Sequence, residues 1–144
     1  MRRGVWNLRA QRCFRPIAQA LSKVRGREGF RVVHFSVQGN HLHLVVEASD
    51  RPSMTQGLRA LLIRVAKRLN EVMGTHGGVY ADRFHERVLR TPSEVRNAVR
   101  YVLRNHEHHY AATPAPDRFS SAVATDVVSA PDSWLLRVGW TRAP

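Results

Sequence analysis

The feature that most constrains the fold of this sequence is a predicted β-hairpin over residues 30–48. Its first strand, 30–37 (FRVVHFSV), is rich in β-branched and aromatic side chains, which favour a strand. Its second strand, 41–48 (HLHLVVEA), returns after a turn formed by residues 38–40. Because successive side chains of a strand point to opposite faces, His41 and His43 are expected to share one face of the hairpin.

Helical patterns surround the hairpin. Apolar residues recur at spacings of three and four from Cys13 to Val24 and again from Met54 to Met73, as in amphipathic helices. A third helix is expected to open at residues 91–94 (TPSE), which combine an N-cap threonine, a proline at the first helical position and a capping-box glutamate. The chain between the second and third helices, from Val79 to Leu89, is expected to be a short extended piece.

This order of elements predicts an α+β fold, with a ferredoxin-like antiparallel sheet and helices packed on one face. Such a topology needs a strand before the first helix, and only Gly4 to Leu8 is available to supply it, so the first strand is expected to be truncated. We assign residues 1–110 to one domain. Residues 111–144 are predicted to form an extended tail that packs back through Trp134, Leu135 and Trp140.

The charge balance indicates a polyanionic partner. Lys and Arg number 23 against 11 Asp and Glu, a net charge of +12, and Lys occurs only at 23 and 67. Arginine binds phosphate oxygens in pairs and stacks on bases, which favours a nucleic acid, although a GC-rich genome that encodes Arg in place of Lys would give a similar composition.

Other features of the composition narrow the setting. The chain has no apolar run near the roughly 18 residues that cross a bilayer, and its start does not resemble a secretion signal, so we expect no membrane association and a cytoplasmic, nucleoid-associated location. Cys13 is the single cysteine, which excludes an internal disulfide and a cysteine-based zinc cage. Any metal must therefore use other ligands.

Two groups of residues are candidates for chemistry. His41 and His43 stand at i and i+2 on a strand, about 7 Å apart at Cα, from where both imidazoles can reach one metal ion. The alternative is an ordinary half-exposed strand face with no metal. On the third helix, Tyr101 lies away from the predicted apolar stripe and Asn105 follows one turn later. The alternative for Tyr101 is an amphipathic tyrosine at a helix–sheet edge, and Tyr110 is interpreted as packing.

A resemblance brings these groups together. GNHLHLVVEA, followed some sixty residues later by RYVLRN, resembles the single-tyrosine HUH transposases, and most closely the REP-associated tyrosine transposases. The resemblance extends from Val32 to Asn105, although the family usually has Asn-Pro where this chain has Asn105-His106.

The resemblance implies a metal-dependent DNA strand transferase. His41, His43 and Asn105 would hold Mg²⁺ or Mn²⁺, and Tyr101 would nick single-stranded or hairpin DNA and rejoin strands through a 5′-phosphotyrosine intermediate. It also allows a homodimer. Further residues are expected to contact DNA: Arg31, His85, Arg87, Arg100 and Arg104.

Two other functions fit the same residues. One is a catalytically degenerate DNA-binding protein of the same fold, whose DNA affinity would depend on salt and not on metal. The other is a Zn²⁺ enzyme that uses His41 and His43 with a bound water, for which Glu47 is the only evident carboxylate base near the pair. The later histidines 106, 108 and 109 are interpreted mainly as a solvated tract.

Overall fold

The predicted hairpin forms as an antiparallel pair, β1 (Phe30–Val37) and β2 (Leu42–Ala48). A computed structural model describes residues 1–81, 83–109 and 116–144, and for residues 105–109 it describes the helical backbone alone. β1 has the predicted bounds. β2 begins one residue later than predicted, so His41 lies at the end of the turn, directly before the strand.

A bulge in β1 gives the hairpin two different faces. Val32 pairs with Val46 and His34 with Val45, so Val33 is the extra residue on β1. Strict alternation would separate Val32 from Phe35, but the bulge adds one residue and returns both to the same face. Val33 therefore joins the opposite face, where it belongs to a second apolar cluster.

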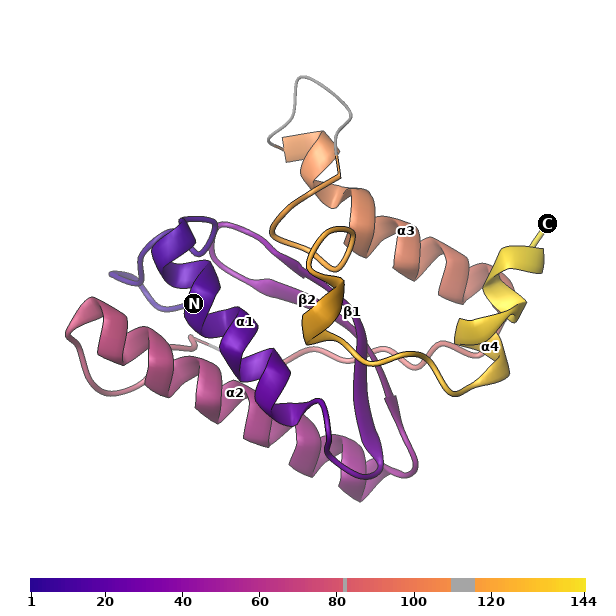
Figure 1. Ribbon diagram of the computed structural model, residues 1–144, viewed down its shortest axis with the longest axis horizontal. Coiled ribbons are helices and arrows are strands. Elements are labelled where there is room, and N and C mark those ends of the chain that lie inside the picture. Colours follow the sequence, from indigo (N-terminus) through magenta and orange to yellow (C-terminus); the bar gives the residue numbers. More distant parts are fainter. Residues whose placement is uncertain (82, 110–115) are drawn as a thin grey trace.

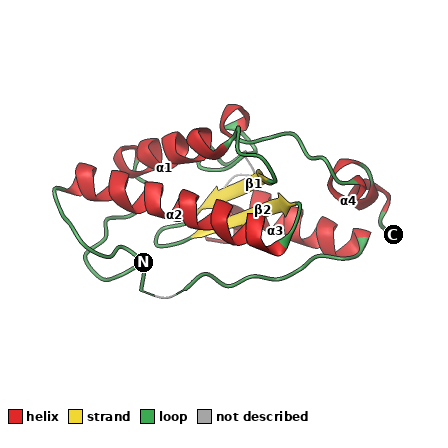
Figure 2. Ribbon diagram, turned by 90° about the horizontal axis from the view of Figure 1, so that it is seen from below, coloured by secondary structure: helices red, strands yellow, loops and turns green. Residues whose placement is uncertain are grey.

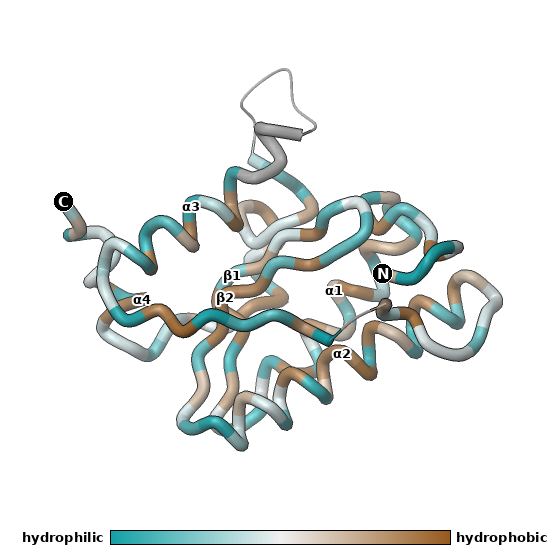
Figure 3. Tube along the Cα trace, turned by 180° about the vertical axis from the view of Figure 1, so that it is seen from behind, coloured by the Kyte–Doolittle hydropathy of each residue, from teal (hydrophilic) through white to brown (hydrophobic). Residues whose placement is uncertain are grey.

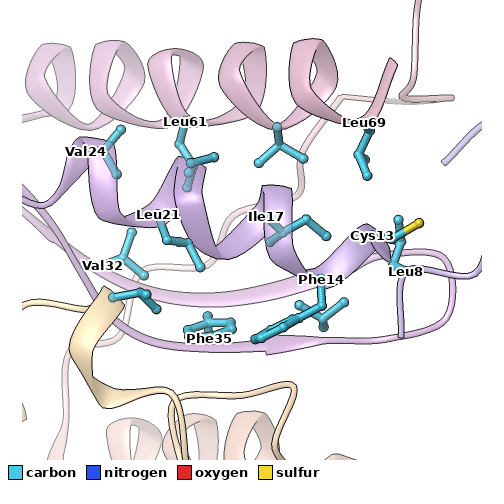
Figure 4. Close-up of a cluster of buried hydrophobic side chains, with 14 of the residues drawn as sticks. Leu8, Cys13, Phe14, Ile17, Leu21, Val24, Val32, Phe35, Leu61 and Leu69 are labelled. Carbon is cyan, nitrogen blue, oxygen red and sulfur yellow. The ribbon is translucent and has the colours of Figure 1, made fainter. Parts of the chain in front are cut away.

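Two helices cover the first face, α1 (Gln11–Val24) and α2 (Arg51–Met73), both close to their predicted positions. α2 begins where the Asp50 carboxylate accepts a hydrogen bond from Ser53 N, and it ends at Gly74, whose φ of 67° suits a residue without Cβ. Figure 1 shows α1 and α2 side by side on one side of the strands. Figure 4 shows their side chains meeting those of β1 in the main apolar core. Each fully buried Leu, Ile or Phe of this core contributes about 1.5–3 kcal/mol.

The other face is covered by α3 (Pro92–His109). Its start is the predicted capping box: Glu94 N donates to Thr91 Oγ1 at 3.2 Å, and the Glu94 carboxylate accepts hydrogen bonds from Arg90 N and Thr91 N. Its buried side chains form a smaller cluster with the hairpin, consisting of Val33, Val45, Val95, Val99, Val102 and Leu136.

The chain after residue 115 lies against the rest of the molecule in short helical turns, namely η1 (Thr125–Val127), α4 (Trp134–Arg137) and η2 (Gly139–Arg142), and Figure 2 shows α4 near the start of α3. Leu135 and Trp140 pack on the α3 cluster as expected, but Trp134 is 56% exposed and Leu136 is the buried side chain of α4.

The C-terminal segment occupies the outer edge of β1. Val37 N donates to Phe119 O and Ser121 N to Phe35 O. A bidentate ion pair stabilises this edge. The two terminal guanidinium nitrogens of Arg9 each lie 2.9 Å from an oxygen of the Asp117 carboxylate, and the Asp117 side chain is only 2% exposed.

The predicted α+β class is confirmed: helices pack against an antiparallel sheet. The described residues form two strands, fewer than the four of a complete ferredoxin-like sheet, and α3 adds a helix on the second face. Gly4–Leu8 forms no strand, since the outer edge of β1 is occupied by residues 119–121 instead.

The connection before α3 is exposed. Residues 83–88 are all exposed and belong to no strand, and Figure 3 shows this mostly hydrophilic stretch crossing the outside of the hairpin. Within the described ranges, no helix combines the length and apolar character needed to span a membrane.

Candidate metal and tyrosine site

The two histidines meet at the turn end of the hairpin. Alternation along β2 places His43, Val45 and Glu47 on the α3 face, where Val45 is buried and His43 is half-buried. His41 Nε2 lies 3.0 Å from His43 Nε2, with the two rings nearly perpendicular. The predicted approach of the two imidazoles is therefore present.

A neighbouring amide orients His41. The Nδ1 atom of His41 lies 2.7 Å from the side-chain oxygen of Asn40. Because that oxygen can only accept a hydrogen bond, it favours the His41 tautomer with the proton on Nδ1. That tautomer leaves a lone pair on Nε2, which points toward His43. Burial, and to a smaller extent the charge of His41, lower the pKa of His43 below its ordinary value, which favours the neutral imidazole that binds metals.

The histidine pair fits a divalent cation with octahedral coordination. Two nitrogens at about 2.1 Å from such an ion and at a right angle to each other lie about 3.0 Å apart. The Nε2–Nε2 distance of 3.0 Å is compatible with this geometry and is also that of a hydrogen bond between the two rings. Among the residues whose side chains are described, no group of three or more His, Cys, Asp or Glu could hold a metal ion. The pair would thus supply two ligands, and the others must be oxygens of amides, water or substrate.

Tyr101, on α3, contacts the histidine pair through His43. Val95, Val99 and Val102 form the buried stripe of α3, and Tyr101 lies off it, 54% exposed, which confirms the helical phase predicted from the sequence. Its ring makes an edge contact with His43, with centroids 5.1 Å apart and planes at 77°. A strand and a helix far apart in the chain therefore bring His41, His43 and Tyr101 into one cluster within a single molecule.

Tyr80 shows a different environment for the same side chain. Its hydroxyl donates to Leu62 O at 2.8 Å, and burial raises its pKa above the ordinary value. A phenol in this state is a poor nucleophile, so Tyr101 is the better placed tyrosine for chemistry.

Asn105, the third predicted ligand, stands on α3 one turn after Tyr101, and its side chain lies outside the described residues. The same holds for the side chains of His106, His108 and His109 and for Tyr110.

The residues predicted to contact DNA divide into two groups. Arg100 and Arg104 are exposed on α3 beside Tyr101. The others lie elsewhere: Arg31 donates to Ala130 O in the C-terminal segment, Arg87 approaches Glu94 at 4.0 Å, and His85 is exposed in the connection before α3.

Sequence reasoning missed two polar residues of this face, Ser36 and Gln38. Gln38 lies between β1 and β2, as predicted for the turn, and its N–H donates to His41 O at 2.8 Å. Ser36 pairs with His43 and Val37 with Leu42, and the same register continued by one residue would have placed Gln38 opposite His41.

A comparison of this chain with models of known families, with curated proteins and with solved structures finds no match.

Proposed function

We propose that the protein is a metal-dependent nickase and strand transferase of single-stranded or hairpin DNA that acts through a tyrosine nucleophile. The observation that carries this proposal is the contact of Tyr101 with His43, whose Nε2 is in turn 3.0 Å from His41 Nε2. A solvent-accessible phenol beside a pair of imidazoles suited to a cation is the arrangement that phosphoryl transfer to a tyrosine requires.

The chain's own groups would perform the reaction as follows. His41 and His43, with an oxygen ligand such as Asn105, would hold Mg²⁺ or Mn²⁺, which when bound polarises the scissile phosphate. The Tyr101 oxygen loses its proton to solvent and bonds to phosphorus, while the bond from phosphorus to the 3′-oxygen breaks and that oxygen takes up a proton. Attack by another 3′-hydroxyl reverses the step and releases Tyr101. No external energy is needed, because the phosphotyrosine retains the energy of the bond.

Surface charge supports DNA as the substrate. Arg100 precedes Tyr101 on α3 and Arg104 follows it by almost one turn, and both are exposed. Guanidinium groups at these positions can bind phosphates on either side of a scissile bond placed at Tyr101. The net charge of +12 adds long-range attraction for a polyanion.

One observation weakens the zinc-hydrolase alternative. The Glu47 carboxylate, the expected base, accepts hydrogen bonds from Asp132 N at 2.8 Å and Ser133 N at 2.9 Å at the start of α4. A carboxylate held there by two backbone donors is occupied, and this favours tyrosine chemistry over activation of a water.

The test is incubation of the full chain with a labelled single-stranded hairpin and Mn²⁺. We expect a covalent protein–DNA adduct that maps to Tyr101. The adduct should not form with Tyr101→Phe, nor with the wild type when a chelator is present. Tyr80→Phe is the matched control, since it removes a phenol that lies away from the histidines and should leave the adduct intact. An adduct that persists in Tyr101→Phe, or none in the wild type, would contradict the proposal.

The second candidate is a DNA-binding protein of the same fold without catalysis. It is favoured by the net charge of +12 and by the exposed Arg100 and Arg104 of α3, since guanidinium groups bind phosphates without a metal. It predicts DNA affinity that falls steeply with salt and is unchanged by Mn²⁺, which fluorescence anisotropy titrations at several salt concentrations would measure.

A further inference from the structure

The side chain of Gln38 is buried next to the histidine pair, and half of its amide lacks a partner in the described part of the chain. Gln38 is 2% exposed; its Nε2 donates to Ser36 Oγ, whereas its Oε1 accepts no hydrogen bond. In this orientation of the amide, the oxygen is the atom that has no partner. A buried amide oxygen without a donor calls for an explanation, such as an ion.

The backbone of the turn brings Gln38 opposite His41. Gln38 N donates to His41 O at 2.8 Å, and Ser36 is the register partner of His43. Residues directly opposite each other in an antiparallel pair point to the same face, with Cβ atoms about 5 Å apart. Ser36, Gln38, His41 and His43 therefore form one polar patch, made of a cross-strand pair and the adjoining pair of turn residues. Because Nε2 is held at Ser36, Oε1 is the end of the amide that has no hydrogen-bond donor in the described part of the chain.

The missing partner fits the coordination chemistry of the site. Mg²⁺ and Mn²⁺ prefer oxygen ligands, whereas His41 and His43 provide only nitrogens. We propose that the amide oxygen of Gln38 is an oxygen ligand of the divalent cation at His41 and His43. This inference rests on the proposed function, since it names a further residue of the same metal site.

The experiment measures Mn²⁺ affinity of the full chain without DNA, by isothermal titration calorimetry and by electron paramagnetic resonance of the unbound ion. Gln38→Ala should weaken Mn²⁺ binding by about tenfold or more, as loss of a contact at a metal site does. Gln38→Glu should strengthen it, because a carboxylate keeps the shape of the side chain, can accept a hydrogen bond from Ser36 and adds a negative charge toward the cation. Gln56→Ala and Gln56→Glu, on the exposed side of α2, are the matched controls and should change nothing.

The outcomes separate this inference from the proposal on which it rests. Equal Mn²⁺ affinity in wild type and Gln38→Ala, or weaker binding in Gln38→Glu, would overturn the role of Gln38 while leaving the histidine site in place. A wild type that binds no Mn²⁺, or binding that survives His43→Ala, would overturn the metal site itself and this inference with it. Thermal unfolding without metal checks that each variant folds, and if Gln38→Ala does not, Gln38→Glu decides alone.

Discussion

The two faces of the β1–β2 hairpin differ in what covers them. Under α1 and α2 the side chains are apolar along the whole of β1: Phe30, Val32, Phe35 and Val37 are all at most 4% exposed. Under α3 the apolar cover is a smaller cluster around Val33 and Val45, and toward the turn it gives way to the polar patch of Ser36, Gln38, His41 and His43. One face is thus apolar along its length, whereas the other carries polar groups, of which His41 is exposed and His43 is half-buried.

The largest expected effect is on the apolar face. Phe35→Ala removes a side chain that is 1% exposed and stacks on Phe14, and it should lower the free energy of unfolding by about 3–5 kcal/mol. Chemical denaturation followed by circular dichroism measures this loss. Phe84→Ala, at a position that is 43% exposed, is the control and should cost far less. Similar losses in both variants would contradict the assignment of the core to this face.

Close packing on the same face gives the second prediction. A Cβ at Gly57 would lie 2.2 Å from the ring of Phe30, whose side chain is fully buried. Gly57→Ala should therefore destabilise the protein by about 1–3 kcal/mol, even though alanine favours helix, because the ring must shift. Gly26→Ala, which meets nothing within 4 Å, should be close to neutral in the same denaturation assay. A stabilised Gly57→Ala would show that this packing is loose.

The start of α3 tests how firmly the helix with Tyr101 is held. Thr91→Ala removes the hydroxyl that accepts from Glu94 N, and a lost N-cap costs about 1 kcal/mol. We expect a matching fall in the denaturation midpoint. Thr55→Ala, at an exposed position of α2, should show no such fall. If Thr91→Ala were equally silent, the capping box would not contribute to the stability of α3.

His34, on β1, should make the stability of the protein depend on pH. It lies opposite Val45, and burial lowers its pKa below the ordinary 6.5. Below that pH the unfolded chain binds a proton that the folded chain resists, so His34 makes the protein less stable as pH falls through 6.5 toward the folded pKa. His34→Gln should lose less stability than wild type between pH 7.5 and 5. His76→Gln, an exposed control, should follow the wild type, and identical curves for all three proteins would refute the prediction.

The smallest expected change in stability is at Tyr101. Because its side chain is 54% exposed, Tyr101→Phe should alter the free energy of unfolding by less than about 0.5 kcal/mol. The same variant is expected to lose the DNA adduct entirely. That combination would show that Tyr101 serves function and not stability. A strongly destabilised Tyr101→Phe would instead show that the Tyr101 hydroxyl stabilises the fold.

Local patterns predicted much of this molecule. The bounds of β1, the face shared by His43, Val45 and Glu47, and the capping box of α3 follow from propensity, alternation and hydrogen bonds between near neighbours in the chain. The position of Tyr101 away from the core stripe follows from helical phase alone. These features need no knowledge of distant contacts.

Other features depend on contacts between distant parts of the chain, which no local pattern contains. The bulge at Val33 places Val32 and Val33 in two different apolar clusters, and the buried Asp117 is paired with Arg9, which lies 108 residues before it in the chain. The burial of Gln38 and the occupation of Glu47 by the start of α4 likewise arise from packing. The sequence alone therefore determined the elements and the candidate residues His41, His43 and Tyr101. Only the tertiary structure decided that they meet, because the distance between β2 and α3 is set by side chains packed between them.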